Sequence, residues 1–151
     1  MKVKIKKLSE NAVIPFKKHD DDFCYDVVAT SCEEIAPNVY KYGTGLALQI
    51  EEGNRRMSKR RGAILGIDAR PRSSVWKTGM VLSNCYGTID AGYTGEISAV
   101  FYHVMPNMPK YEVGDRIMQI CIGHTYDIEF EEADELSTTD RGDGGYGSTG
   151  K

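Results

Sequence analysis

The sequence has no hydrophobic run long enough to form a membrane-spanning helix. Such a helix needs roughly 18 consecutive apolar residues, and no stretch of this chain approaches that length. The first seven residues alternate lysine with β-branched side chains and lack the apolar centre of a secretion signal. We therefore expect no membrane association and a cytoplasmic location, or a nuclear one in a eukaryotic cell.

The sequence also lacks an excess of positive charge and the cysteine spacing of a metal site. Its 19 basic residues are outnumbered by 22 acidic ones, which argues against a protein that coats nucleic acid. The four cysteines and three histidines are scattered, and no two cysteines have Cys-x-x-Cys spacing, so a structural zinc site is not expected. The cysteines are interpreted as small apolar residues of a reducing compartment.

The remaining pattern is that of one all-β domain. The chain has 151 residues, of which 40% are hydrophobic and 27% charged, enough for a single soluble core. Short apolar runs separated by turn residues predict strands rather than helices, in a jelly-roll-like fold. Only residues 73–79 favour a short helix, with Ser73 or Ser74 as its cap. Strands are predicted over residues 2–6, 23–28, 45–50, 63–67, 96–104, 116–122 and 128–131.

The predicted strand 96–104 carries apolar side chains on both of its faces. Side chains alternate along a strand, so these residues divide into two sets. A strand that is apolar on both faces lies between two layers or at a subunit interface. The two sets are Ile97, Ala99 and Phe101 on one face, and Val100, Tyr102 and Val104 on the other.

Two polar segments interrupt this pattern. Residues 51–62 contain five basic side chains and almost nothing apolar; we interpret them as a solvated hairpin loop, with a patch that attracts a polyanion as the alternative. Residues 137–151 contain five glycines among Ser, Thr and Asp, which predicts a flexible tail. We therefore expect a folded domain over 1–136 and a tail over 137–151 that closes over a ligand.

The end of the tail fits the spacing G-x-x-x-x-G-K of a Walker A loop, but the mechanics of that loop are missing. It needs a preceding strand, a Ser or Thr after the lysine and a helix that faces the phosphates. Neither a Ser or Thr nor a helix follows Lys151 in this sequence, so we reject the Walker A interpretation. What remains is a glycine-rich backbone with hydroxyls and Arg141, which suits phosphate binding.

Three further stretches combine polar side chains with turn residues. Residues 71–74 place an arginine and two hydroxyls before a short helix, residues 84–93 form a glycine-punctuated hairpin with Asp90 and Tyr93, and residues 114–119 join a turn to Gln119. Each stretch alone is also explained as a surface turn or a local cap.

Together with residues 23–26 and the tail, these three stretches resemble, in their order along the chain, the five motifs of the trimeric deoxyuridine triphosphatases (dUTPases). The motifs are placed at residues 23–26, 70–74, 87–96, 114–119 and 141–150, so the resemblance covers essentially the whole chain. It implies a jelly-roll-like distorted β-barrel and a homotrimer with shared active sites. It also implies hydrolysis of dUTP to dUMP and pyrophosphate, which limits uracil in DNA and supplies dUMP for dTMP synthesis.

The resemblance implies a role for several residues of the hairpin. Asp90 would orient and deprotonate the water that attacks the α-phosphorus. Tyr93 would pack on the deoxyribose and leave no room for a 2′-hydroxyl. The hairpin would read the uracil edge by hydrogen bonds, which leaves polar groups unpaired against cytosine. The groups concerned are the Asn84 side chain and the backbone of Thr88, Ile89 and Asp90.

The other motifs are implied to bind the triphosphate, with Mg²⁺ as cofactor. The phosphates themselves would hold most of the Mg²⁺ coordination, with Asp26 reaching the ion through water. Arg141, Ser148 and Thr149 would clamp the γ-phosphate while Tyr146 stacks over the uracil. The phosphate-binding positions are Arg72, Ser73, Ser74 and Gln119, and the tail positions are Arg141, Tyr146, Gly147, Ser148 and Thr149.

The sequence departs from the family pattern at several positions. Cys24 and Ser74 stand where glycines are usual, and Tyr146 replaces the commoner phenylalanine. The segment 51–62 is longer than the corresponding family hairpin. None of these changes affects Asp90, Tyr93 or Arg141.

Two alternatives remain open. A dCTP deaminase of the same fold would carry a glutamate acid–base where Val100 stands, so it would lack a catalyst here. A regulatory binding protein could keep the fold and contact a partner through residues 51–62. A turnover assay on a loop deletion separates this role from hydrolysis.

Overall fold

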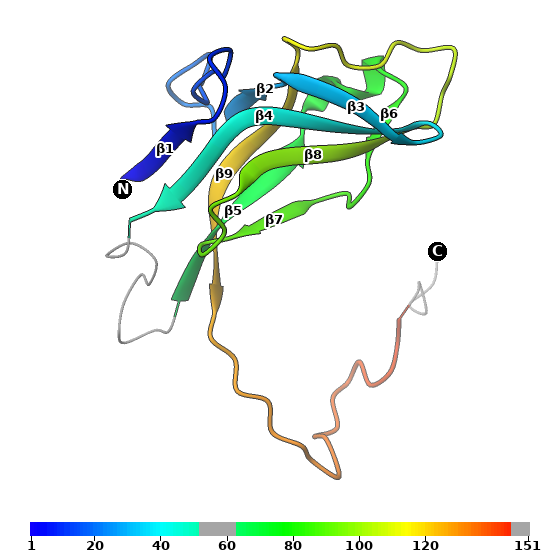
Figure 1. Ribbon diagram of the computed structural model, residues 1–151. Coiled ribbons are helices and arrows are strands. Elements are labelled where there is room, and N and C mark those ends of the chain that lie inside the picture. The colour runs from blue at the N-terminus through cyan, green and yellow to red at the C-terminus, as the bar shows by residue number, and fades with distance from the viewer. Residues whose placement is uncertain (52–62, 146–151) are drawn as a thin grey trace.

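The computed structural model describes residues 1–51 and 63–145 as two antiparallel sheets packed face to face (Figure 1). The first sheet has the order β1-β4-β8-β6, and β3 also pairs with β4. The second has the order β2-β9-β5-β7. The first sheet contains β1 (Val3–Lys7), β3 (Ser31–Ala36), β4 (Val39–Ile50), β6 (Met80–Leu82) and β8 (Glu96–His103). The second contains β2 (Tyr25–Val28), β5 (Ala63–Pro71), β7 (Gly87–Asp90) and β9 (Arg116–Tyr126).

The expected all-β class is therefore confirmed. A search of the described residues for a helix that could cross a membrane found no candidate. Most of the basic segment and the tail positions Tyr146, Gly147, Ser148 and Thr149 lie outside the described residues.

The core lies between the two sheets and is built by side-chain alternation. In β8 the buried residues are Ile97, Ala99 and Phe101, as the sequence predicts. Phe101 is fully buried and packs edge-on against Tyr42 and Tyr111, with ring centroids 5.8 and 5.4 Å away. The Tyr42 hydroxyl donates a hydrogen bond of 2.8 Å to the backbone carbonyl of Tyr111, and burial raises the pKa of Tyr42. This aromatic cluster fixes β4 and β8 against the loop that enters β9.

Strand β4 is long and pairs with three strands, β1, β3 and β8, with a bulge near its middle. Its register with β8 shifts between Gly43 and Ala47, after which the strand pairs with β1 (Figure 1). Gly45 has φ +64°, and a Cβ there would lie 2.9 Å from the Cβ of Ser9, so this position requires glycine. The buried Thr44 hydroxyl donates a hydrogen bond of 2.6 Å to the Ile97 carbonyl and keeps the bulge joined to β8.

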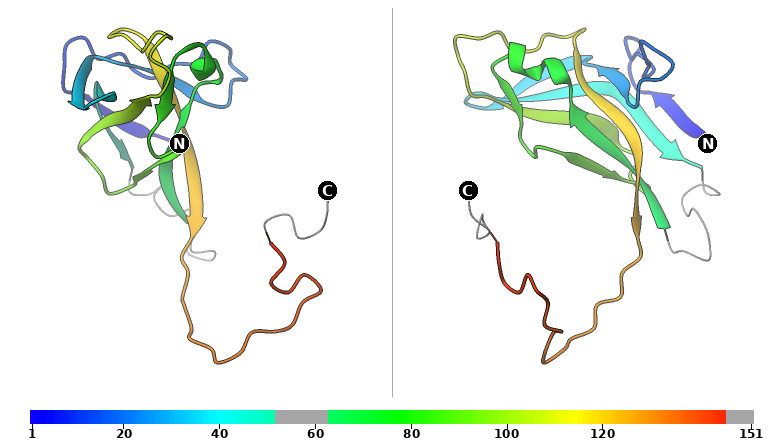
Figure 2. Two further views of the ribbon diagram at one scale, coloured as in Figure 1. Left: turned by 90° about the vertical axis from the view of Figure 1, so that its right-hand side faces the viewer. Right: turned by 180° about the vertical axis from the view of Figure 1, so that it is seen from behind.

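Several predicted boundaries differ from the structure. Three strands, β3, β6 and β7, were not predicted. The predicted strand 128–131 is wrong: no strand is formed there, and Phe130 is 90% exposed. Strand β9 ends at Tyr126, and residues 127–145 then run away from the body without helix or strand (Figure 2). The second apolar face of β8 is only partly covered in the single chain, because Tyr102 is 47% exposed.

The predicted helix is a single 3₁₀ turn, η1 (Ser73–Lys77). Its N-cap is Arg72, and no side chain caps it, so the expectation that Ser73 or Ser74 caps the helix is wrong. The Ser74 hydroxyl instead accepts a hydrogen bond of 3.1 Å from Nη1 of Arg72.

Candidate functional site

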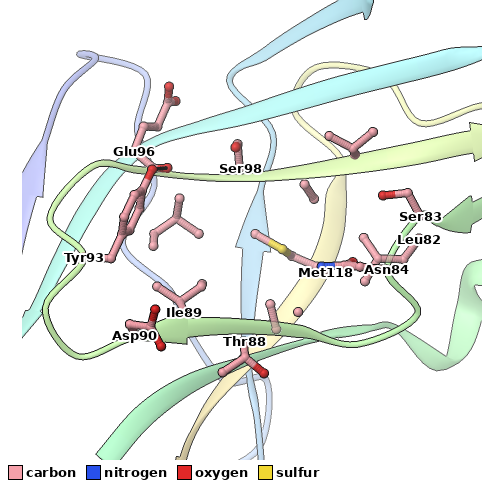
Figure 3. Close-up of a pocket in the computed structure, with 15 residues that line it drawn as sticks. Leu82, Ser83, Asn84, Thr88, Ile89, Asp90, Tyr93, Glu96, Ser98 and Met118 are labelled. Carbon is pink, nitrogen blue, oxygen red and sulfur yellow. Dashed lines mark hydrogen bonds between the residues drawn. The ribbon is translucent and has the colours of Figure 1, made fainter.

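The polar residues of the hairpin gather around a cavity of about 280 Å³ between the two sheets. We call it the hairpin pocket; β6, β7, β8 and the loops between them form its walls (Figure 3). It brings together five of the residues predicted from the sequence. These are Asn84, Thr88, Ile89, Asp90 and Tyr93.

Tight turns at both ends of β7 shape this pocket. Before β7, Cys85 has φ +56° and its N–H donates a hydrogen bond of 2.9 Å to the Leu82 carbonyl. A side chain at positive φ is uncommon, so the surrounding hairpin must hold this conformation. After β7, the Tyr93 N–H donates to the Asp90 carbonyl at 2.9 Å, which turns the chain back toward β8. Residues of both turns, Asn84 and Tyr93, line the cavity.

The two carboxylates of the hairpin pocket have different surroundings. Glu96 accepts a hydrogen bond of 2.8 Å from the Gly45 N–H and thereby ties β8 to the bulge in β4. Asp90 is exposed, and no described residue forms an ion pair with it. The Tyr93 hydroxyl donates a hydrogen bond of 3.0 Å to the Glu96 carbonyl, which holds its ring against the start of β8 (Figure 3). Asp90 is therefore the carboxylate with free oxygens. Sequence reasoning missed Glu96 because its partner lies 51 residues away.

A second cavity, of about 450 Å³, lies beside β2, β5 and β9 and contains other predicted residues. We call it the basic pocket because five lysines and arginines line it against two carboxylates. The predicted residues Asp26, Arg72, Ser73 and Gln119 are among its lining. Its charged side chains are Lys17, Lys18, Arg70, Arg72 and Arg116, with Asp22 and Asp26.

Asp26 organises the arginines of the basic pocket. Nε of Arg72 donates to its Oδ1 at 2.8 Å, and Nη1 of Arg116 donates to its Oδ2 at 2.9 Å. Only 14% of the Asp26 side chain is exposed, so these charge-assisted bonds are partly shielded from water. Gln119, opposite Asp26 in the register of β2 and β9, donates to the Pro71 carbonyl at 3.1 Å. Together these bonds hold the start of η1 against β2 and β9.

Arg116 is a functional candidate that the sequence reasoning overlooked. The sequence pattern points to the stretch 114–119 but singles out only Gln119 within it. The ion pair between Arg116 and Asp26 joins residues 90 positions apart, and only the pairing of β2 with β9 brings them together.

Arg70 lies between two aromatic rings at the rim of the basic pocket. Its guanidinium carbon is 5.7 Å from the ring centroid of Phe23 and 5.2 Å from that of Tyr86. Hydrogen bonding to Tyr86 raises the pKa of Arg70. This arrangement keeps a positive charge at the pocket entrance.

The described residues contain no group of three His, Cys, Asp or Glu side chains placed to hold a metal ion. The oxygens of Asp26 already accept three guanidinium N–H groups: Oδ1 accepts from Nε of Arg72, and Oδ2 accepts from Nη1 of Arg116 and Nη2 of Arg72, so Asp26 suits a cation only through water. A metal that brings its own waters and phosphate ligands fits this site; a metal held entirely by described side chains does not.

Arg141 is separate from both pockets in the single chain. It is exposed, and its Nε donates a hydrogen bond of 3.1 Å to the Gly144 carbonyl within the tail. The hairpin and basic pockets share no lining residue. The predicted residues therefore form two clusters and a tail rather than one complete site.

Comparison with known proteins identifies a family. The family model described as dUTPase matches residues 10–150. The chain is 37% identical to the deoxyuridine 5′-triphosphate nucleotidohydrolase of Nautilia profundicola, with 100% of both chains covered. It is also 37% identical to that of Corynebacterium glutamicum, covering 99% of this chain and 95% of the relative.

Solved structures show the same fold. The dUTPase of Staphylococcus bacteriophage 80alpha with dUPNHPP superposes with a TM-score of 0.78 at 25% identity, covering 99% of each chain. A mutant dUTPase of phage phi11 of S. aureus, described as coordinating a structural Mg(II) ion, has a TM-score of 0.69 at 22% identity. That match covers 91% of this chain and 100% of the phage protein.

Proposed function

This chain belongs to the dUTPase family, and on that premise we propose that it hydrolyses dUTP to dUMP and pyrophosphate. The observation that carries the proposal is the hairpin pocket, in which Asn84, Asp90 and Tyr93 surround one cavity. The basic pocket supplies the complementary charge for a triphosphate. Such an enzyme would limit uracil in DNA and supply dUMP for dTMP synthesis.

The hairpin pocket would bind the nucleoside. The Asn84 side chain and the backbone of residues 88–90 offer donors and acceptors for the N3–H and O4 of uracil. Cytosine reverses this pattern and would leave polar groups unpaired, at a cost of about 1–3 kcal/mol per group. The Tyr93 ring, fixed through its hydroxyl, would pack on the deoxyribose and exclude a 2′-hydroxyl.

Asp90 would act as the general base. It lines the hairpin pocket and makes no ion pair with a described residue, so its oxygens can accept the proton of a water molecule. That water would attack the α-phosphorus, with pyrophosphate as the leaving group. Glu96 is a poorer candidate because it already accepts the Gly45 N–H.

The basic pocket would bind the phosphates through Arg72, Ser73 and Gln119, which line it, and through Ser74, whose hydroxyl accepts a hydrogen bond from Nη1 of Arg72. Asp26 would keep Arg72 in place and, through water, reach a Mg²⁺ ion carried by the nucleotide. When bound, Mg²⁺ neutralises part of the phosphate charge. Asp26 would hold Arg72 in place without the ion, since its hydrogen bonds with the guanidinium groups of Arg72 and Arg116 form within the chain.

The division of the site favours a homotrimer with shared active sites. The two pockets share no residue, Arg141 contacts neither, and the outer face of β8 leaves Tyr102 half exposed. Residues 1–136 would form the folded domain, and the tail 137–151 would close over bound triphosphate through Arg141, Tyr146, Gly147, Ser148 and Thr149. Light scattering at micromolar concentration tests this assembly, and a monomeric mass would contradict it.

The deciding experiment measures pyrophosphate release from dUTP, dCTP, dTTP and UTP side by side, with and without Mg²⁺. We expect release from dUTP far above the others and dependence on the metal. Ammonia release from dCTP would instead indicate a deaminase, for which Val100 offers no acid–base group. Absence of pyrophosphate from all four nucleotides would refute the proposal.

A further inference from the structure

Two cysteines, Cys24 and Cys121, lie opposite each other on neighbouring segments of the second sheet, beside the basic pocket. The register of β2 and β9 pairs Tyr25 with Ile120 and Asp26 with Gln119. Continued by one residue, it places Cys24 opposite Cys121, in agreement with the hydrogen bond between their side chains. Directly opposed residues in antiparallel strands have Cα atoms about 4.5–5.5 Å apart. A disulfide spans Cα separations of roughly 4.4–6.8 Å. The continued register therefore implies a backbone spacing that a cross-strand disulfide can span.

The two thiols are in contact but differ in exposure. Cys121 is 6% exposed and Cys24 is half buried, and both are free thiols. Burial, followed by a hydrogen bond with the Cys24 thiol, raises the pKa of Cys121 to about 11. Cys24 is therefore the thiol that a reagent can reach, and Cys121 is the thiol that can reach Cys24.

We propose that Cys24 and Cys121 are a reversible disulfide site, oxidised by exchange with a small anionic disulfide such as oxidised glutathione. The Cys24 thiolate attacks one sulfur of the reagent, its S–S bond breaks, and one glutathione thiolate leaves. Cys121 then loses its proton to solvent, attacks Sγ of Cys24 and releases the second glutathione. In total, two protein thiols are oxidised, one glutathione disulfide is reduced to two thiols, and one protein disulfide forms.

The basic pocket explains the preference for an anionic reagent. Cys24 lines this pocket, whose lysines and arginines outnumber its carboxylates five to two. Such a field raises the local concentration of an anion, and salt weakens it. Oxidised glutathione carries several carboxylates, whereas bis(2-hydroxyethyl) disulfide is neutral. We expect glutathione to modify Cys24 roughly tenfold faster than the neutral disulfide at low salt, and this advantage to shrink at high salt.

The second step depends on pH because Cys121 must become a thiolate. Burial, the largest cause of its raised pKa, persists in the mixed disulfide, so Cys121 stays mostly protonated at neutral pH and its thiolate fraction grows about tenfold per pH unit below the pKa. Contact with Cys24 offsets the low fraction, since reaction between positioned groups is effectively intramolecular. Closure of the mixed disulfide should therefore accelerate as pH rises from 7 to 9.

The experiment treats the reduced full-length protein with oxidised glutathione, then uses alkylation, intact mass and peptide mapping. We expect the loss of two hydrogens, a Cys24–Cys121 linked peptide, and its reversal by dithiothreitol. In Cys121→Ala, Cys24 should retain one glutathione because no second thiol displaces it. In Cys24→Ala, Cys121 should stay unmodified. The matched control, Cys32→Ser with Cys85→Ser, removes the two exposed thiols and should still form the link.

Circular dichroism of each variant establishes that it is folded, and the control variant keeps both thiols of the site. Three outcomes would overturn the proposal. They are a folded protein in which Cys24 keeps glutathione although Cys121 is present, equal rates with the anionic and neutral reagents, and modification confined to Cys32 or Cys85.

Discussion

Replacing Asp26 by asparagine tests the organisation of the basic pocket. The change keeps the size of the side chain but removes the charge that holds Arg72 at 2.8 Å and Arg116 at 2.9 Å. Hydrogen bonds to charged groups contribute about 1.5–3 kcal/mol each. The Arg72 side chain is 22% exposed, so its bond should approach that range. Arg116 is 39% exposed, and its pair is worth about 1 kcal/mol or less.

Asparagine can still accept one N–H, so the expected loss in the free energy of unfolding is about 1.5–3 kcal/mol. In urea this shifts the midpoint by about 1 M for a domain of ordinary denaturant sensitivity. KM for dUTP should rise roughly tenfold with a smaller change in kcat, because Arg72 loses its fixed position before the phosphates arrive. Both measurements are made at one protein concentration, since association changes apparent stability.

Asp22→Asn is the matched control. Asp22 lines the same pocket, but its carboxylate accepts the backbone N–H groups of Lys18 and His19 at 3.2 and 3.0 Å, which an asparagine oxygen can also do. It removes the same charge without breaking an arginine pair. If Asp26→Asn left both the midpoint and KM at the wild-type values, or if both variants changed equally, the reasoning would be refuted.

Three further predictions test the base, the tail and the core. Asp90→Asn should lower kcat by about 10²–10⁴-fold while dUTP binding stays nearly unchanged; more than about half of the wild-type kcat would remove Asp90 as the base. Amide exchange in residues 137–151 should slow with a non-hydrolysable dUTP analogue more than with dUMP, because only the triphosphate offers Arg141 a γ-phosphate; equal protection would contradict the clamp. Phe101→Ala should destabilise the fold by about 3–5 kcal/mol in urea unfolding, since its buried ring packs against Tyr42 and Tyr111.

Prediction from the sequence succeeded where a strand buries one face. Ile97, Ala99 and Phe101 alternate with less buried positions, and that period identified β8. It failed for β3, whose six residues are all exposed and leave no burial pattern to detect. Ile128 and Phe130 gave the same alternation as a strand, yet both are exposed and no described strand pairs with them. An alternating pattern indicates which side chains would be buried if the segment were a strand. It does not show that a neighbouring strand is present to pair with it.

The functional residues could be predicted where they lie close together in the sequence, but not where strand pairing brings them together. Short motifs placed Asp90 and Tyr93 correctly around one cavity, because both lie within a few residues of one hairpin. The pairing of Asp26 with Arg116, and of Cys24 with Cys121, depends on the register of two strands about ninety residues apart. Neither spacing nor composition contains that register, so these contacts became visible only in the folded chain.

The separation of the two pockets makes a mixture of two inactive chains informative. An Asp90→Asn chain keeps an intact basic pocket, and an Arg72→Ala chain keeps an intact hairpin pocket, since the two pockets share no residue. If each working centre takes its hairpin from one subunit and its basic pocket from another, unfolding the two variants together and refolding them should restore part of the turnover. If one chain supplied both pockets to the same centre, the mixture would stay as inactive as its components. Two defects would then complement each other only through assembly.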